Sequence, residues 1–243
     1  MIPKLGLTRN VIRPHYALIT TDGYVCSSLP GWTSATINVL LSAALGAGLV
    51  QYLITLDTRG LGVGDTECDE WFVYVISGKA KVNQVTLTAG GFAYIPLGTR
   101  YDIRSAAKGT KLLVFRKVYE AFAGFAPPAF FTGQESEIGE TPFLGDPHAR
   151  LKTLIPDTTG VDMAVNIFTY DPGATLPFVE THVMEHGMLF LTGSGVYRLG
   201  DDWHPVTAGD AIWIAPYCPQ WFIAAGPAPA RYIYYKDVNR TPL

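Results

Sequence analysis

The sequence has little charge of either sign and few cysteines. Only 16% of its 243 residues are charged, and the formal net charge is -3 at pH 7. This composition provides no basic surface, so we expect no nucleic-acid partner. Because 48% of the residues are hydrophobic, an intrinsically disordered chain is excluded. The three cysteines are widely spaced, at Cys26, Cys68 and Cys218, which is typical of reduced intracellular thiols rather than of a disulfide framework.

The sequence also lacks a convincing membrane segment. Residues 34–56 are apolar and long enough to cross a bilayer, but polar residues and glycines interrupt them and no basic cluster flanks them. We interpret this stretch as two strands joined at residues 44–48, and we expect no membrane partner. Residues 1–6 do not resemble a secretory leader, so we expect the protein in the cytoplasm of a microbe.

An internal repeat organises the chain. Residues 71–80 parallel residues 186–195, with turn glycines 193 − 78 = 115 residues apart. Further on, residues 87–96 parallel residues 206–216, at an offset of 209 − 90 = 119. Both copies are rich in Val, Ile, Tyr, Phe and Trp, with Gly or Pro at the breaks, which indicates short β-strands. The repeat predicts an all-β protein made of two jelly-roll β-barrels in tandem.

Composition suggests where the two domains meet. A stretch rich in Pro, Gly and Phe runs from about residue 119 to residue 141. We therefore place an N-terminal domain at residues 1–120, a connection at 121–145 and a C-terminal domain at 146–243.

Three side chains able to bind a metal gather near residue 180. Glu180 and His182 share a face of an extended strand, because side chains two residues apart point the same way. A sharp turn after His182 would bring His186 opposite them. With Gln220 downstream, the spacing resembles the two cupin motifs, with several ligand identities exchanged. Two oxygens and two nitrogens suit Mn²⁺, Fe²⁺ or Ni²⁺ and leave coordination positions for substrate or water.

Two other interpretations compete for these histidines. His182 and His186 could be hydrogen-bonded histidines with no ligand. Residues 182–186 also spell H-x-x-E-H, the inverted zinc-protease motif, which needs a helix so that both imidazoles share one face. Gly187 and the apolar run after it predict a strand and a turn instead, so we reject the protease.

The first domain does not repeat the metal-binding set. At the offset of 115 residues, the counterparts of Glu180, His182 and His186 are Asp65, Glu67 and Trp71, and Gln220 falls near Arg100. An indole cannot ligate a metal, and a guanidinium repels one. We therefore expect a metal-free first domain with a structural role.

The chain resembles the (S)-ureidoglycine aminohydrolases, a family of bicupin enzymes, over most of its length. The resemblance is carried by Asn10 and by residues 16–23, 53–57, 180–187 and 232–240. It implies Mn²⁺ held by Glu180, His182, His186 and Gln220, although other divalent metals fit the same ligands. It further implies that Tyr197, Gln220, Tyr232 and Lys236 contact the substrate, and that copies associate into assemblies up to an octamer.

The residues themselves support part of this implication. Tyr232, Tyr234 and Lys236 alternate along an expected strand and share one face. An inward lysine is costly unless paired, which suggests a clamp for a substrate carboxylate, and tyrosine hydroxyls can hydrogen-bond a ureido group. Alternatively, the tyrosines are core aromatics and Lys236 reaches solvent. Glu185 has the opposite parity to His186, so we expect it to face away from the metal, in a salt bridge or in solvent.

The function implied is hydrolysis of (S)-ureidoglycine, a small-molecule substrate, to (S)-ureidoglycolate and ammonia in purine (allantoin) catabolism. Glu180, as a proton shuttle, and Lys236 are the candidate catalytic residues. Two alternatives remain open at this point: another metal-dependent cupin enzyme, such as a dioxygenase or isomerase, and a non-catalytic cupin that binds a small organic acid. The apolar content favours a homo-oligomer of at least two copies.

Overall fold

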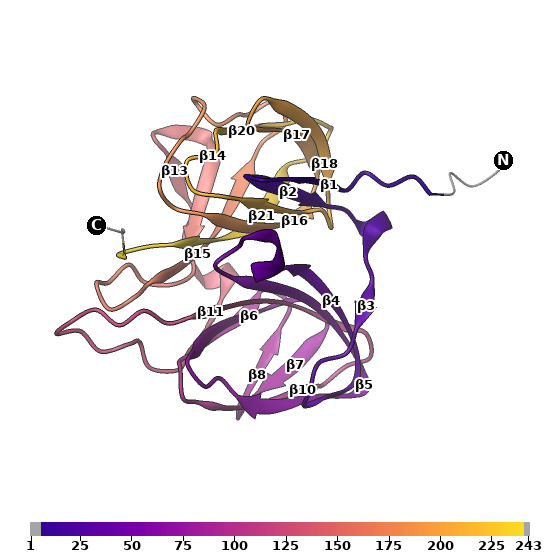
Figure 1. The fold of residues 1–243 in the computed structure, drawn as a ribbon, viewed down its shortest axis with the longest axis vertical. Coiled ribbons are helices and arrows are strands. Elements are labelled where there is room, and N and C mark those ends of the chain that lie inside the picture. Colours follow the sequence, from indigo (N-terminus) through magenta and orange to yellow (C-terminus); the bar gives the residue numbers. More distant parts are fainter. Residues whose placement is uncertain (1–5, 241–243) are drawn as a thin grey trace.

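The computed structural model describes residues 6–240 and is built almost entirely of β-strands, arranged as two stacked β units (Figure 1). The first unit contains a ten-stranded sheet in which β12, β9, β6, β11, β5, β10, β7 and β8 follow one another, while β4 pairs with β5 and β3 with β4. The bounds of its strands are β3 (Cys26–Ser27), β4 (Trp32–Leu41), β5 (Val50–Asp65), β6 (Asp69–Ser77), β7 (Lys79–Val82), β8 (Val85–Thr88), β9 (Gly91–Ile95), β10 (Arg100–Ser105), β11 (Thr110–Val118) and β12 (Phe131–Gln134).

The second unit contains two sheets. The larger has the order β1-β2-β19-β16-β21-β15-β14-β13, and the smaller has the order β18-β17-β20. The bounds are β1 (Val11–Arg13), β2 (Tyr16–Ile19), β13 (Thr141–Phe143), β14 (Asp146–Thr153), β15 (Met163–Tyr170), β16 (His186–Thr192), β17 (Ser194–Leu199), β18 (Asp202–Thr207), β19 (Ala211–Ile214), β20 (Gln220–Ala224) and β21 (Ala230–Asp237).

Helical structure in residues 6–240 is confined to three short 3₁₀ turns, η1 (Thr21–Gly23), η2 (Ala43–Leu45) and η3 (Glu135–Glu137). No helix in this part of the chain has the length and apolar character needed to cross a membrane. The apolar residues 34–56 form β4, η2 and β5, and this confirms the prediction of two strands joined near residues 44–48. The prediction of an all-β chain is likewise confirmed.

The strand pairing departs from the expected domain limits at two places. β2 pairs with β19, with Leu18 opposite Ile212, so residues 11–19 belong to the second unit although we placed them in the first domain. In Figure 1 these N-terminal strands lie in the upper half of the view, among the strands of the second unit. β12, inside the expected connection, pairs with β9 of the first unit. β2 joins the second unit because β19 would otherwise be an edge strand. Pairing with β2 gives hydrogen-bond partners to the backbone N–H and C=O groups along that edge.

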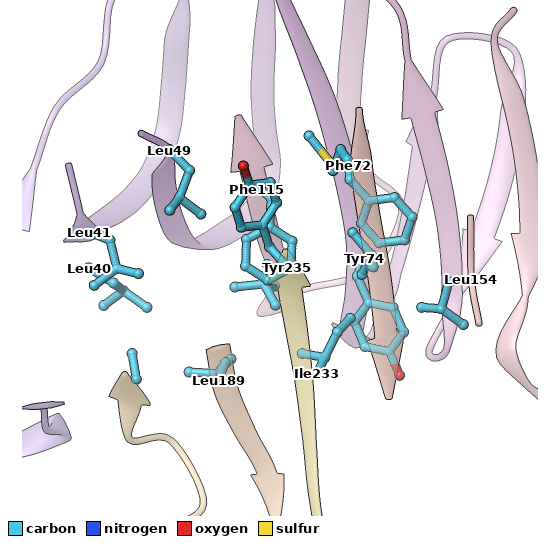
Figure 2. Close-up of a cluster of buried hydrophobic side chains, with 14 of the residues drawn as sticks. Leu40, Leu41, Leu49, Phe72, Tyr74, Phe115, Leu154, Leu189, Ile233 and Tyr235 are labelled. Carbon is cyan, nitrogen blue, oxygen red and sulfur yellow. The ribbon is translucent and has the colours of Figure 1, made fainter. Parts of the chain in front are cut away.

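A shared hydrophobic core joins the units. Phe72, Tyr74 and Phe115 of the first unit pack with residues of the second such as Ile233 and Tyr235 (Figure 2). The rings of Phe115 and Tyr235 have centroids 6.1 Å apart. Two further clusters fill the interiors of the individual units. Strands β16 and β21 therefore bury both faces, one against the first unit and one inside the second.

Charged groups are buried at this interface as well. The Lys117 ammonium at the end of β11 donates to Asp162 Oδ2 of the second unit (2.5 Å), and Tyr94 donates to Glu70 Oε2 (2.6 Å). Burial, first, and then the hydrogen bond to and negative charge of Asp162 raise the pKa of Glu70 to about 8. The folded protein therefore keeps a proton on Glu70 in a pH range where an unfolded chain releases it.

We predict that this proton makes stability depend on pH. The folded-state pKa of Glu70 lies above its ordinary value of 4.5, so its contribution is complete below pH 4.5 and is lost as pH rises toward about 8. In Glu70→Gln the amide resembles the protonated acid. Urea unfolding at pH 5, 6, 7 and 8 should show the unfolding free energy falling more steeply in the wild type than in the variant. Parallel pH profiles for the two proteins would contradict the prediction.

Candidate metal and substrate site

A cavity of about 180 Å³ opens inside the second unit. Its walls come from β13, β15, β16, β17, β20 and β21 and from the loop that precedes β16. The structure brings to this one cavity every residue that the sequence analysis named as a candidate for the site: Glu180, His182, His186, Tyr197, Gln220, Tyr232 and Lys236.

The backbone around the loop fixes where these side chains start. Glu180 N–H donates to the Gln220 carbonyl oxygen (2.8 Å), and Gln220 N–H donates back to the Glu180 carbonyl oxygen (2.9 Å). Tyr217 N–H donates to the His182 carbonyl oxygen (2.7 Å). The loop that carries Glu180 and His182 is thus tied to the start of β20, which carries Gln220, while His186 begins β16.

The two imidazoles point their Nε2 atoms at each other, 3.2 Å apart. Each ring makes a hydrogen bond to the backbone through Nδ1. His182 Nδ1 lies 3.0 Å from the Met184 carbonyl oxygen, and His186 Nδ1 lies 3.2 Å from the Tyr235 carbonyl oxygen. Because a carbonyl only accepts, Nδ1 carries the proton in both rings and Nε2 presents a lone pair. Two facing lone pairs repel unless a cation lies between them, so this pair fits a divalent metal ion.

Burial keeps both histidines neutral. Desolvation, followed by the electrostatic influence of the neighbouring His182 ring, lowers the pKa of His186 to about 3. Desolvation also lowers the pKa of His182, and Lys236 contributes in the same direction. Neutral imidazole is the form that ligates metals, so the residues are prepared for an ion at neutral pH.

Gln220 stands beside His182 and is held by Tyr197. Gln220 Nε2 lies 3.0 Å from His182 Nε2, and the buried Tyr197 hydroxyl donates to Gln220 Oε1 (3.0 Å). Turning the amide over would present its oxygen toward the imidazoles, where it could ligate a metal.

Glu180 lines the same cavity, but its carboxylate does not form a close cluster with the two imidazoles. Across residues 6–240, no three His, Cys, Asp or Glu side chains are gathered closely enough to hold an ion. Desolvation raises the pKa of the Glu180 carboxyl, and Lys236 opposes the shift. The part of the site already assembled is therefore the imidazole pair with the Gln220 amide, and Glu180 would complete it by moving inward.

The strand β21, which pairs with β16, supplies a further part of the wall. Tyr232, Tyr234 and Lys236 line the cavity, as their alternation predicts, while Ile233 and Tyr235 face the first unit. Tyr232 Oη lies 3.3 Å from Tyr170 Oη, and Asn166 Nδ2 donates to Tyr234 Oη (3.2 Å). Lys236 is half-buried and makes no ion pair with any described residue, so its ammonium is available to an anion.

Comparison with known proteins places the chain in a family. The Cupin domain model matches residues 166–235. A probable (S)-ureidoglycine aminohydrolase from Oryza sativa subsp. japonica is 34% identical over 98% of this chain and 78% of its own length. The (S)-ureidoglycine aminohydrolase of Escherichia coli K12 is 36% identical over 93% of this chain and 89% of its own length. The chain belongs to the (S)-ureidoglycine aminohydrolase family.

A solved structure shares the fold of this chain over nearly its whole length. The crystal structure of protein Ylba from E. coli superimposes with a TM-score of 0.86 at 34% identity, covering 97% of this chain and 96% of that one.

In this aminohydrolase-family chain the H-x-x-E-H segment is not a helix. Residues 182–185 form an irregular loop and His186 opens strand β16. The inverted zinc-protease arrangement is therefore excluded. The Glu185 side chain faces away from the cavity, as its parity predicts. Contrary to the expectation of a salt bridge or solvent, it is buried and accepts a hydrogen bond from Trp213 Nε1 (3.0 Å).

Several lining residues escaped the sequence analysis. They are Phe143, Phe168, Met184 and Met188. Met188 could have been found from the parity of β16, because it lies two residues from His186, whereas Phe168 lies on β15, which carried no candidate residue to set the parity. Phe143 and Met184 carry no such signal, because one lies on a short strand and the other on a loop.

In the first unit, aromatic rings occupy the region that matches the metal site. Trp71, the counterpart of His186, packs against Tyr101 with centroids 4.7 Å apart, and the Arg116 guanidinium lies 5.7 Å from the Trp71 ring. Asp65 and Arg100 face each other across β5 and β10. A metal-free first unit stays a prediction, and this packing favours it.

We predict that Tyr197→Phe destabilises the metal-free protein by loosening Gln220. The change removes the donor to a buried amide oxygen, and an unpaired buried acceptor costs about 1–3 kcal/mol. Urea unfolding after chelation measures the loss. The matched control is Tyr217→Phe, whose side chain is exposed and should change stability by less than about 0.5 kcal/mol. Equal stability of Tyr197→Phe and wild type would contradict the role given to this hydroxyl.

Proposed function

We propose that this protein is a metal-dependent (S)-ureidoglycine aminohydrolase. It would release ammonia from (S)-ureidoglycine and form (S)-ureidoglycolate in purine catabolism. The curated relatives carry that enzyme name over nearly the whole chain. The observation that carries the metal part is the pair of imidazole Nε2 atoms, 3.2 Å apart, inside a cavity that also holds Lys236.

The metal we propose is Mn²⁺, held by Glu180, His182, His186 and Gln220. Once bound, it would supply a Lewis acid that helps to hold the substrate. Glu180 and Gln220 provide the oxygen ligands, which a hard divalent ion favours, and the histidines are already neutral. The fit needs the Glu180 side chain to move inward and the Gln220 amide to turn over.

The chain's own residues account for substrate binding. The substrate has a carboxylate, an amine and a ureido group on one carbon. The Lys236 ammonium would hold the carboxylate, because it is half-buried and otherwise unpaired among the described residues. The hydroxyls of Tyr197 and Tyr232 would hydrogen-bond the ureido group. With the metal also contacting the substrate, as a third contact to groups on the same carbon, a single enantiomer would fit.

Proton transfer is assigned to Glu180. The reaction breaks the bond from carbon to the amine, forms a bond from that carbon to the oxygen of water, and passes a proton to the departing ammonia. Burial raises the pKa of Glu180, which brings the carboxyl closer to the pH at which it can both accept and return a proton. Lys236, which lines the same cavity, would keep the carboxylate of the substrate in place during this step.

We also propose a cytoplasmic enzyme that forms homo-oligomers. Cys26, Cys68 and Cys218 are all free thiols, which suits a reducing compartment. Large apolar side chains such as Phe178 and Tyr217 are exposed on the second unit, which suits contact between copies. Gel filtration with light scattering would measure the assembly.

The first experiment measures ammonia release from freshly generated (S)-ureidoglycine. The protein is chelated and then assayed with and without added Mn²⁺, against the spontaneous decay of this unstable substrate. We expect Mn²⁺-dependent acceleration and only the (S)-ureidoglycolate product. Absence of acceleration in protein shown to hold the metal would contradict the assigned substrate.

A further prediction concerns His186→Ala, which removes one of the two facing nitrogens. Metal content, measured by elemental analysis after loading and gel filtration, should fall below a tenth of the wild-type value, roughly the loss expected when a ligand is removed. Turnover should disappear with it. His148→Ala is the control, because that exposed histidine pairs with Asp171 on the surface. Full turnover by metal-free His186→Ala would overturn the proposal.

A further inference from the structure

Glu185 lies between the two histidines in sequence and links them to the first unit. Its carboxylate Oε2 accepts from Trp213 Nε1 (3.0 Å) and from the backbone N–H of Gly48 (3.1 Å). Gly48 belongs to the first unit, in the turn before β5. The side chain is buried, so these two donors hold it in a fixed position.

The peptide between Met184 and Glu185 carries this constraint to the site. Its N–H, on Glu185, donates to Asp237 Oδ1 (2.6 Å). Its carbonyl, on Met184, accepts from His182 Nδ1 (3.0 Å). Asp237 thus holds this peptide through its N–H, and the carbonyl of the same peptide orients the His182 imidazole. Glu185 precedes His186 directly, so the same anchor also sets where the second imidazole begins.

Close packing shows that the first unit is fitted to this loop. A Cβ on Gly48 would lie 2.7 Å from Glu185 Oε1, so a larger residue there would force the Glu185 carboxylate to shift. A Cβ on Gly187 would lie 2.7 Å from Leu49 Cδ1 of the first unit. Gln51 Nε2 donates to the Met188 carbonyl oxygen (3.1 Å). Residues 185–188, which include His186, are therefore braced by residues 48–51.

The internal repeat supplies a comparison within the same chain. Glu70 is the counterpart of Glu185 (185 − 115 = 70), is also buried, and accepts from Tyr94 as Glu185 accepts from Trp213. Trp71 follows Glu70 where His186 follows Glu185. The two glutamates share burial and an aromatic donor, but only one stands beside metal-capable residues.

We propose that Glu185 is a positioning residue through which the first unit sets the metal affinity of the second. This inference rests on the metal site of the proposed function. Ligands bind an ion tightly only when their orientation is held in advance, and losing an outer partner typically weakens binding by about 10–100-fold.

The test compares Glu185→Ala with Glu70→Ala. Both delete a buried carboxylate bonded to an aromatic donor, so both should lower the urea midpoint. Titration calorimetry with Mn²⁺ should show a dissociation constant about 10–100-fold higher for Glu185→Ala and unchanged for Glu70→Ala. Glu185→Gln should return the constant close to wild type, because its amide oxygen still accepts from Trp213 and Gly48. The loss of the free Mn²⁺ signal in electron paramagnetic resonance provides a second binding measurement.

Gly48→Ala tests the link from the first unit and carries the experiment if Glu185→Ala does not fold. Its added methyl should displace the Glu185 carboxylate and raise the Mn²⁺ dissociation constant. Wild-type affinity in folded Glu185→Ala or in Gly48→Ala overturns this inference while leaving the metal site intact. A wild-type protein that binds no Mn²⁺ overturns the metal site of the proposed function, and the inference with it.

Discussion

The site depends on two strands that are buried on both faces. β16 and β21 place His186, Tyr232, Tyr234 and Lys236 on one face and apolar residues such as Ile233 on the other. Side chains alternate along a strand, so packing against the first unit fixes the strands and thereby aims the inner residues at the cavity. The shared core is thus a structural requirement of the site as well as a source of stability.

Desolvation is the second constraint. A buried imidazole resists protonation, which leaves its Nε2 lone pair for an ion, and a buried carboxyl resists ionisation. The same effect acts on Glu70 at the interface and on Glu180 in the cavity, with different consequences. Glu70 shares its surroundings with Asp162 and Lys117 inside the protein. Glu180 faces a cavity, where a metal or a substrate can compensate the charge.

The two copies of the repeat share a β framework but differ at the position of His186, which is filled by aromatic rings in the first unit and lines a cavity in the second. Trp71 and Tyr101 fill in the first unit the region that stays open around His186 in the second. The buried glutamate before each of these positions is common to both. A duplicated framework of this kind can keep its packing while only one copy carries ligands.

The sequence by itself determined the strands, the repeat, the family and the candidate residues that the structure brings to the cavity. Alternation placed Tyr232, Tyr234 and Lys236 on one face, and the spacing of Glu180, His182, His186 and Gln220 marked the proposed ligands, because both are local properties of an extended chain. Only the tertiary structure decided that residues 11–19 join the second unit, that Phe143 and Met184 reach the cavity, and that Glu185 is anchored by Gly48. Each of these depends on a contact between segments far apart in the chain, and no local pattern encodes which distant partner a strand edge or a buried carboxylate will meet.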